Sequence, residues 1–163
     1  MARYYTVPLS FTVTAAGGDV DIAALKPAAD KPIEIISLVL GQSTEAGDAA
    51  EENLDLALIH MTGTITNGSG GAAITPVANR AGTTEVVAAG FTVRGNDTTL
   101  TTTSGTSTTQ RPFGWNERNN PYERYFPEES RPKAISGEAL VLRSLVAVAD
   151  DINVRGEMVV KEE

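Results

Sequence analysis

Apolar and polar residues alternate with a period of two in this sequence, and that pattern most limits the folds open to it. Between Tyr5 and Val13 the odd positions hold Tyr, Val, Leu, Phe and Val, while the even positions hold Thr, Pro, Ser and Thr. Successive side chains of a β-strand point to opposite faces, so this segment is predicted to be a strand with one buried face. Pro8 has no N–H group and favours a sheet edge. Helical periodicity is scarce elsewhere, so the chain is predicted to be all-β.

Further segments carry strand-like patterns. Residues 33–41 are more uniformly apolar, as expected for a buried central strand. Residues 53–66 alternate leucine with other residues and are predicted to form one long strand that is broken at Gly63. Residues 138–147 and 152–161 are joined by a short acidic connection, and we expect them to form a hairpin.

The connecting segments differ in composition. Residues 21–26, with the sequence DIAALK, are predicted to form a short helical turn before Pro27. Residues 42–53 carry only acidic charges and are predicted to form an exposed loop. The glycine-rich run 67–71 is predicted to be a flexible turn. Residues 91–110 are rich in threonine but offer little apolar mass, which favours exposed or edge strands.

These signals predict an antiparallel β-sandwich of jelly-roll type with a long loop rich in aromatic residues and proline. About seven to nine strands, with a turn signal at roughly every dozen residues and no alternation of strands with helices, favour this class over a parallel α/β fold. The 163 residues are predicted to form one domain, because domains usually contain about 100 to 200 residues.

Composition limits the chemistry. The chain has no cysteine, which excludes disulfides and thiolate metal sites, and its single histidine, His60, excludes mechanisms that need two. A formal net charge of −8 repels phosphate groups, so we expect no nucleic-acid partner. No apolar run approaches the roughly 20 residues of a membrane span, so we expect no membrane partner. The first residues lack the pattern of a secretory signal, and the start is predicted to be uncleaved.

Patterns for catalysis and metal binding are weak. The acidic residues of the stretch 42–53 lack the spacing of a calcium-binding loop, so a solvated surface explains them better. His60 follows a leucine-rich strand, which favours a structural or surface role, and no nucleophile motif accompanies it. No pair of carboxylates can be assigned to glycoside hydrolysis. We therefore expect a protein that is not an enzyme and that holds no metal ion and no cofactor.

The most unusual segment is residues 111–133, which we call the arm and which is rich in aromatic residues, arginine and proline. Tryptophan, tyrosine and arginine are enriched at the centres of protein interfaces, and proline limits the entropy that a loop loses on binding. We predict that the arm contacts a partner through Phe113, Trp115, Arg118, Tyr122, Arg124, Tyr125 and Phe126. The N-terminal strand, with Tyr4 and Tyr5, is the second candidate.

Three other interpretations of these segments stay open. The aromatic side chains of the arm could cap the open end of this protein's own sandwich. They could instead stack on sugar rings, since aromatic faces pack well against apolar surfaces. The threonine-rich residues 91–110 could pair with a neighbouring molecule by strand addition.

Four runs span most of the chain in this order: DVDIAALKPAADKPIEIISLVLGQSTEAGDAAEENLDLALIHMTGT, NGSGGAAITP, NDTTLTTTSGT and FPEESRPKAISGEALVLRSLVAVADDINVRGEMVVKEE. In this order they resemble the small accessory structural proteins of tailed bacteriophages. The resemblance implies a β-sandwich virion protein, first of all a capsid decoration or cement protein that stabilises the head through contacts between subunits. A component of the tail or vertex, or a module that binds host glycans, is the alternative.

The same resemblance implies the partners and the location. The partners would be the major capsid protein or other virion proteins. Further copies of this chain would form a homo-oligomer, which we expect to be a trimer at local threefold positions. The protein would be located in the virion after assembly in the host cytoplasm.

Overall fold

The structure is a computed structural model, and it describes residues 2–15, 17–43, 53–79, 88–116, 118, 121–145, 148 and 150–163. Nearly all regular structure in this part of the chain is β. The strands are β1 (Arg3–Val13), β2 (Val20–Pro27), β3 (Ile33–Gln42), β4 (Asn53–Thr62), β5 (Ile65–Thr66), β6 (Ala72–Ile74), β7 (Val77–Ala78), β8 (Phe91–Gly95), β9 (Thr102–Thr103), β10 (Ser107–Asn116), β11 (Tyr122–Tyr125), β12 (Lys133–Ala134), β13 (Glu138–Ser144) and β14 (Ile152–Glu162). A short 3₁₀-helix, η1 (Glu128–Ser130), follows β11.

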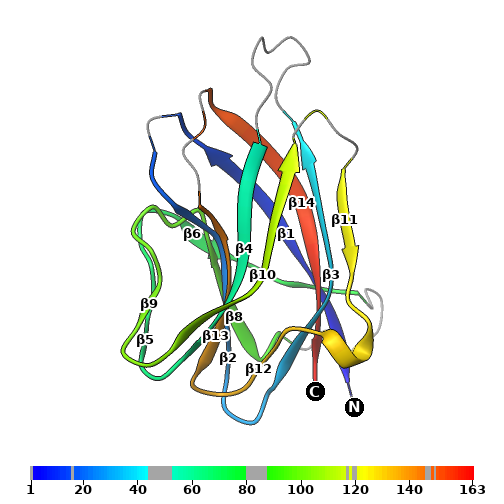
Figure 1. Cartoon of the computed structure of the whole chain (residues 1–163). Helices are drawn as coiled ribbons and strands as arrows, with labels where there is room; N and C mark the ends of the chain where they lie inside the picture. The colour runs from blue at the N-terminus through cyan, green and yellow to red at the C-terminus, as the bar shows by residue number, and fades with distance from the viewer. Residues whose placement is uncertain are drawn as a thin grey trace.

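The strands form two antiparallel sheets that face each other (Figure 1). Sheet A has the order β11-β3-β14-β1-β7, with β12 beside β3, and sheet B has the order β10-β4-β13-β2-β8-β6. The first and last long strands are neighbours, with Arg3 opposite Glu162, so the two chain ends lie side by side. The predicted all-β, antiparallel sandwich is confirmed.

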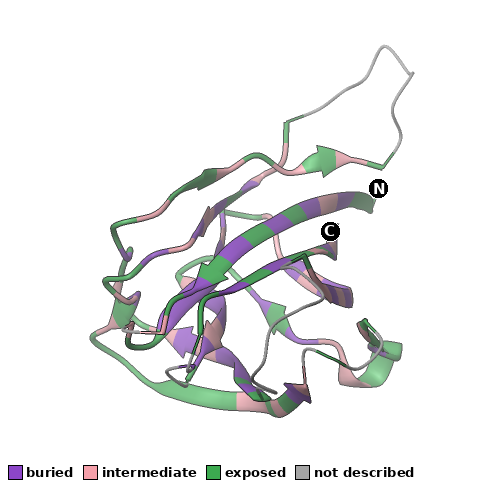
Figure 2. Cartoon of the chain, turned by 90° about the horizontal axis from the view of Figure 1, so that it is seen from above, coloured by how far each residue is buried: buried purple, intermediate pink, exposed green. Residues whose placement is uncertain are grey.

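The main core lies between the sheets and follows from the alternation in the sequence. In β1 the side chains from Tyr5 to Val13 at odd positions are buried, while Pro8, Ser10 and Thr12 are exposed on the other face. Figure 2 shows this as purple and green stripes along the strand next to the N-terminus. Burying a leucine or phenylalanine side chain contributes about 1.5–3 kcal/mol, so this face fixes the register of β1 against β14.

The outer face of sheet B is covered by a third layer. A second apolar cluster lies there, made of Ala24, Ala57, Ile59, Met61, Ala139 and Val141, with Ile65 packed against it. The cover consists of residues 63–71 and 96–106, which contain the short pair β5 and β9, and we call these segments the covering loops. In Figure 1 the pair β5 and β9 lies apart from the two main sheets, at the left edge of the molecule.

Buried ion pairs dock the covering loops onto sheet B. Asp21 of β2 is fully buried and pairs with Arg143 of β13, with 2.6 Å between Oδ1 and Nε. The Thr101 N–H donates to Asp21 Oδ2 at 2.6 Å, and its carbonyl accepts from Arg143 Nη2 at 2.9 Å. Since both charges are hydrogen-bonded as well as paired, the cost of removing them from water is offset.

A second buried carboxylate orders the glycine-rich run. Asp97 accepts two hydrogen bonds from the Arg94 guanidinium and one from the backbone N–H of Gly71. A Cβ atom on Gly68 would collide with the Thr99 carbonyl, so glycine is required there by close packing. Gly68 is buried, and residues 67–71 therefore pack as part of the covering loops.

Two secondary-structure predictions are wrong. Residues 21–26 are part of strand β2 instead of forming a helical turn, because β2 pairs with β13 on one side and with β8 on the other. The last two long strands do not form a hairpin. β13 pairs with β2 and β4 in sheet B, whereas β14 pairs with β1 and β3 in sheet A. The chain crosses from one sheet to the other between them.

Other predictions are confirmed, wholly or in part. β3 is a central strand of sheet A, and the strand over residues 53–66 is interrupted at Gly63, which has a φ angle of +97°. Most of the predicted acidic loop, residues 44–52, lies outside the described residues. For the threonine-rich region 91–110, the prediction of exposed or edge strands is right for the start of β10, which is an exposed edge strand. It is wrong for β8, which lies between β2 and β6 and buries Phe91 and Val93.

Candidate interaction surface

Three of the predicted contact residues are part of the core. Trp115, Phe126 and Tyr5 keep only 5%, 3% and 2% of their surface exposed. Trp115 is on β10 opposite Leu54, and Phe126 follows β11 with its N–H bonded to the Ile36 carbonyl. Both face the space between the sheets, where large apolar side chains are most stabilising. We therefore correct their assignment from partner contacts to core residues.

The arm itself closes one side of the sandwich. Its first part is the edge strand β10 of sheet B and its second part contains the edge strand β11 of sheet A. Phe113 and Tyr122, one from each strand, stack with ring centroids 4.5 Å apart and an angle of 15° between the rings. The Arg124 guanidinium lies 5.3 Å from the centre of the Phe126 ring. These contacts favour the interpretation that the aromatic residues cap this protein's own sandwich.

Four of the other predicted residues are exposed. Tyr125 is 65% exposed and Tyr4 is 47% exposed, and Arg118 and Arg124 are also exposed. Tyr125 and Tyr4 belong to different segments of the chain, but both project from the outer face of sheet A. Tyr125 is opposite Ser37 of β3, and Tyr4 is opposite Lys161 of β14. The structure thus places one residue from each of the two predicted contact segments on the same face, with β3 and β14 between their strands.

We call the outer face of sheet A the open face, because the described residues place no further layer on it. One row of cross-strand neighbours runs over five of its six strands: Tyr125, Ser37, Val159, Thr6 and Val77. The two ends of the row are large exposed side chains, since Val77 is 56% exposed. Neighbouring sheet residues lie within contact distance of each other, so the row forms a continuous surface.

Val77 could not be found from the sequence. It lies in β7, a strand of two residues that pairs only with Tyr5 and Thr6 of β1. A strand this short has no alternation to detect. Its position on the open face depends on pairing with a strand about seventy residues away in the chain, as the register of Thr6 with Val77 shows.

Beside this row the open face carries an ion-pair network. Glu34 of β3 accepts contacts from Lys133, Lys161 and Arg131, each with an N–O distance of 3.4 Å. Glu163 pairs with Lys133 and Lys161 at 3.3 Å. Hydrogen bonds from Lys133 and then from Lys161 hold the pKa of the Glu163 side chain below its usual value. The network fixes long side chains at one end of the face.

The only histidine has a structural environment. His60 Nε2 lies 3.0 Å from Glu138 Oε2, and the same carboxylate oxygen accepts a hydrogen bond from the Ile135 N–H. Among the described residues, no group of three or more histidine, aspartate or glutamate side chains is placed to hold a metal ion. The described part of the chain also contains no helix long and apolar enough to cross a membrane.

No known protein family, no curated protein and no solved structure matches this chain. Its function is therefore inferred from the surface described above.

Proposed function

We propose that this protein is a non-catalytic structural component of a tailed-phage virion, and that it acts as a capsid decoration or cement protein. The observation that carries the proposal is the open face, on which Tyr4, Tyr125 and Val77 are exposed while the opposite outer face is covered. Exposed tyrosine and apolar side chains on a rigid sheet offer contact area at a low cost in side-chain entropy. The open face would bind the major capsid protein or another virion protein.

The strand order supports a virion role. Sheet A contains the neighbours β11-β3-β14-β1, and sheet B contains the neighbours β10-β4-β13-β2. We propose that these eight strands form a jelly roll. Viral capsid domains use this architecture, and so do lectins. Since one fold supports many functions, the fold favours a virion protein only in combination with the open face.

The protein would stabilise the capsid by burying surface at many separate contacts, without catalysing a reaction. A homo-oligomer, which we expect to be a trimer, would present the open face of each copy to neighbouring capsid subunits. Weak individual contacts then combine, because the second contact is made at the high effective concentration set by the first. Particle symmetry repeats the same contact at every equivalent position.

A glycan-binding module that uses aromatic stacking is less favoured. Such a module needs exposed rings, and the arm's indole, Trp115, is buried together with Phe126. A component of the tail or vertex would use the same open face for its contacts. The number of copies in each particle would distinguish it from a capsid decoration protein.

The test is the binding of the purified protein to particles that lack it, with cryo-electron microscopy of the product. We expect density on a regular icosahedral lattice, with the open face toward the capsid. The double variant Tyr125→Ser with Val77→Ser should bind the particles at least about tenfold more weakly, because two contact side chains are lost. The variant Leu145→Ser is the control, since Leu145 is exposed but follows β13 of sheet B.

Each alternative has a distinct result. A few copies at one vertex or on the tail would replace the decoration role by a connector or receptor-binding role. Failure of the wild-type protein to bind any part of the particle would overturn the virion proposal. Equal weakening by the Leu145 control would show that the open face is not the contact.

A further inference from the structure

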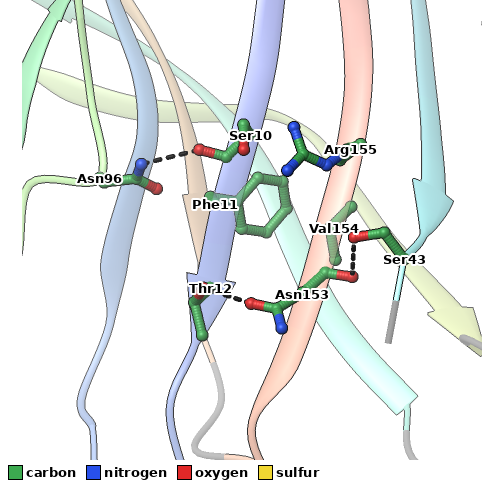
Figure 3. Close-up of a pocket in the computed structure, with 8 residues that line it drawn as sticks. All are labelled: Ser10, Phe11, Thr12, Ser43, Asn96, Asn153, Val154 and Arg155. Atoms are coloured by element: carbon green, nitrogen blue, oxygen red, sulfur yellow. Dashed lines mark hydrogen bonds between the residues drawn. The ribbon is translucent and has the colours of Figure 1, made fainter. Parts of the chain in front are cut away.

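A polar depression of about 450 Å³ lies at one end of the open face, where β1 and β14 are paired (Figure 3). It is separate from the row that ends in Tyr125 and Val77. Its lining residues are mostly small and polar: Ser10, Thr12, Ser43, Asn96, Asn153 and Arg155, with Phe11 and Val154 between them. Binding sites for small molecules usually have volumes of about 300–1,000 Å³, so this depression can hold a single small ligand.

The strand register places the side chains. Ser10 is directly opposite Arg155, and Thr12 is directly opposite Asn153, so all four share the outer face. Ser43 continues from β3 and bonds the Asn153 carbonyl through its N–H at 2.8 Å. Gly41 is the β3 partner of Arg155 and has no side chain. The side of Arg155 that faces β3 is therefore left open.

Asn96 forms the wall next to the edge of β1. It follows β8 of the other sheet, and its Nδ2 donates to the Ser10 carbonyl at 2.8 Å. Its φ angle is +58°, a left-handed conformation that asparagine tolerates better than most residues. Its Oδ1 is buried without a hydrogen-bond partner among the described residues. Left-handed backbone conformations of residues other than glycine cluster at functional sites, and a buried polar atom without a partner calls for an explanation.

The charge of the depression is unusual for this chain. The protein has 21 acidic and 13 basic residues, yet the described lining contains one cation, Arg155, and no carboxylate. Arg155 is exposed and makes no ion pair within the described part of the chain, in contrast to Arg94 and Arg143. Glu157 is the next outward residue on β14, and no ion pair joins it to Arg155.

Polar groups lie near this cation, and the Ser43 hydroxyl among them donates to the Asn153 carbonyl at 3.3 Å, which leaves its oxygen as an acceptor. Figure 3 shows the Arg155 guanidinium turned toward Ser10, with Asn153 and Ser43 on the neighbouring side. Asn153 Oδ1 accepts from Thr12 Oγ1 at 2.5 Å, which leaves the Asn153 amide nitrogen as a donor. A guanidinium suits a carboxylate because it donates two parallel hydrogen bonds, and hydroxyl and amide groups suit the hydroxyls of a sugar.

We propose that the depression is a binding site for a saccharide that carries a carboxylate, of the uronic-acid type. The carboxylate binds Arg155, and the sugar hydroxyls bond to the side chains of Ser10, Asn153 and Ser43. No aromatic stacking is involved, because Phe11 is only 3% exposed. The site is independent of the proposed particle contact, since it uses none of the three side chains that carry that contact.

The experiment is an NMR titration of the ¹⁵N-labelled protein with three probes at constant ionic strength. D-glucuronate carries both the carboxylate and the hydroxyls, glucose carries only hydroxyls, and acetate carries only the charge. We expect saturable shifts at the amides of Ser10, Asn153 and Arg155 with glucuronate. Glucose and acetate should bind at least about tenfold more weakly, because each lacks one part of the recognition.

Variants connect the signal to the site. Arg155→Gln should reduce glucuronate affinity by about tenfold or more, and Ser10→Asp should block binding by supplying a carboxylate directly opposite Arg155. Arg118→Gln is the matched control, because it makes the same change of charge at an exposed arginine outside the depression. The two-dimensional spectrum of each variant reports whether it is folded.

Several outcomes would overturn the proposal. Absence of saturable shifts with glucuronate would mean that the depression is not a binding site for it. Unchanged glucuronate affinity of the Arg155→Gln variant would mean that Arg155 does not bind the carboxylate. Acetate binding as tightly as glucuronate reduces the site to a general anion contact. The double variant Tyr125→Ser with Val77→Ser should bind glucuronate with normal affinity, because neither residue lines the depression. Failure of this inference and failure of the virion proposal can therefore be distinguished.

Discussion

Trp115 lies on an edge strand, but its indole packs against the core. Along β10 the side chains alternate between solvent and the space between the sheets, and Trp115 points inward with 5% of its surface exposed. Tyr125 belongs to the other edge strand and points outward. Two aromatic residues of the arm therefore have different roles, because their side chains point in different directions.

Replacement of Trp115 by alanine should lower the free energy of unfolding by about 3–5 kcal/mol, because a large buried side chain leaves a cavity. Urea denaturation followed by circular dichroism measures this loss. Tyr125→Ala is the control and should change stability by less than about 0.5 kcal/mol, because its side chain is mostly in solvent. Full stability of the Trp115 variant would mean that the indole is not part of the core.

At the scale of elements, the covering loops explain the wrong prediction for β2. Both faces of this strand are buried, one against sheet A and the other beneath the covering loops, so its residues 22–25 form an apolar run without alternation. Periodicity does not separate such a run from a short helical turn. The strand is identified by its backbone pairing with β13 and β8, which are distant in the sequence.

Asp21→Asn should release the covering loops. The substitution keeps the shape of the side chain but leaves the Arg143 guanidinium without its buried counter-charge, at a cost of about 3 kcal/mol. Hydrogen exchange measured by mass spectrometry should speed up in residues 63–71 and 96–106 more than in β14. Asp30→Asn is the matched control, because Asp30 is exposed and asparagine also tolerates its φ angle of +59°. Equal exchange in the two variants would contradict the docking role of Asp21.

At the scale of the whole molecule, the chain ends hold sheet A together. β14 lies between β1 and β3, and its pairing with β1 runs from Arg3 opposite Glu162 to Val13 opposite Ile152. Such pairing closes nearly the entire chain into one loop, and the entropy of closing that loop opposes folding until the contacts of β14 are made.

Removal of residues 152–163 should therefore abolish cooperative unfolding altogether, because the central strand of sheet A and its core side chains Met158 and Val160 are lost. Differential scanning calorimetry of the truncated chain should show no sharp transition. Removal of only residues 1 and 2, which precede β1, should leave the melting temperature unchanged. A sharp transition in the chain that lacks residues 152–163 would mean that sheet B and the covering loops fold without sheet A.

The sequence by itself determined the all-β class, the buried face of β1, the central position of β3 and the break at Gly63, because these depend on local alternation and on backbone freedom. It also predicted Tyr4 and Tyr125 as contact residues, and both side chains are exposed in the structure. Only the tertiary structure decided that Trp115, Phe126 and Tyr5 are buried, that β13 and β14 belong to different sheets, and that Val77 and Arg155 lie on the open face. Those outcomes depend on pairing between segments far apart in the chain, and local periodicity contains no information about which strands become neighbours.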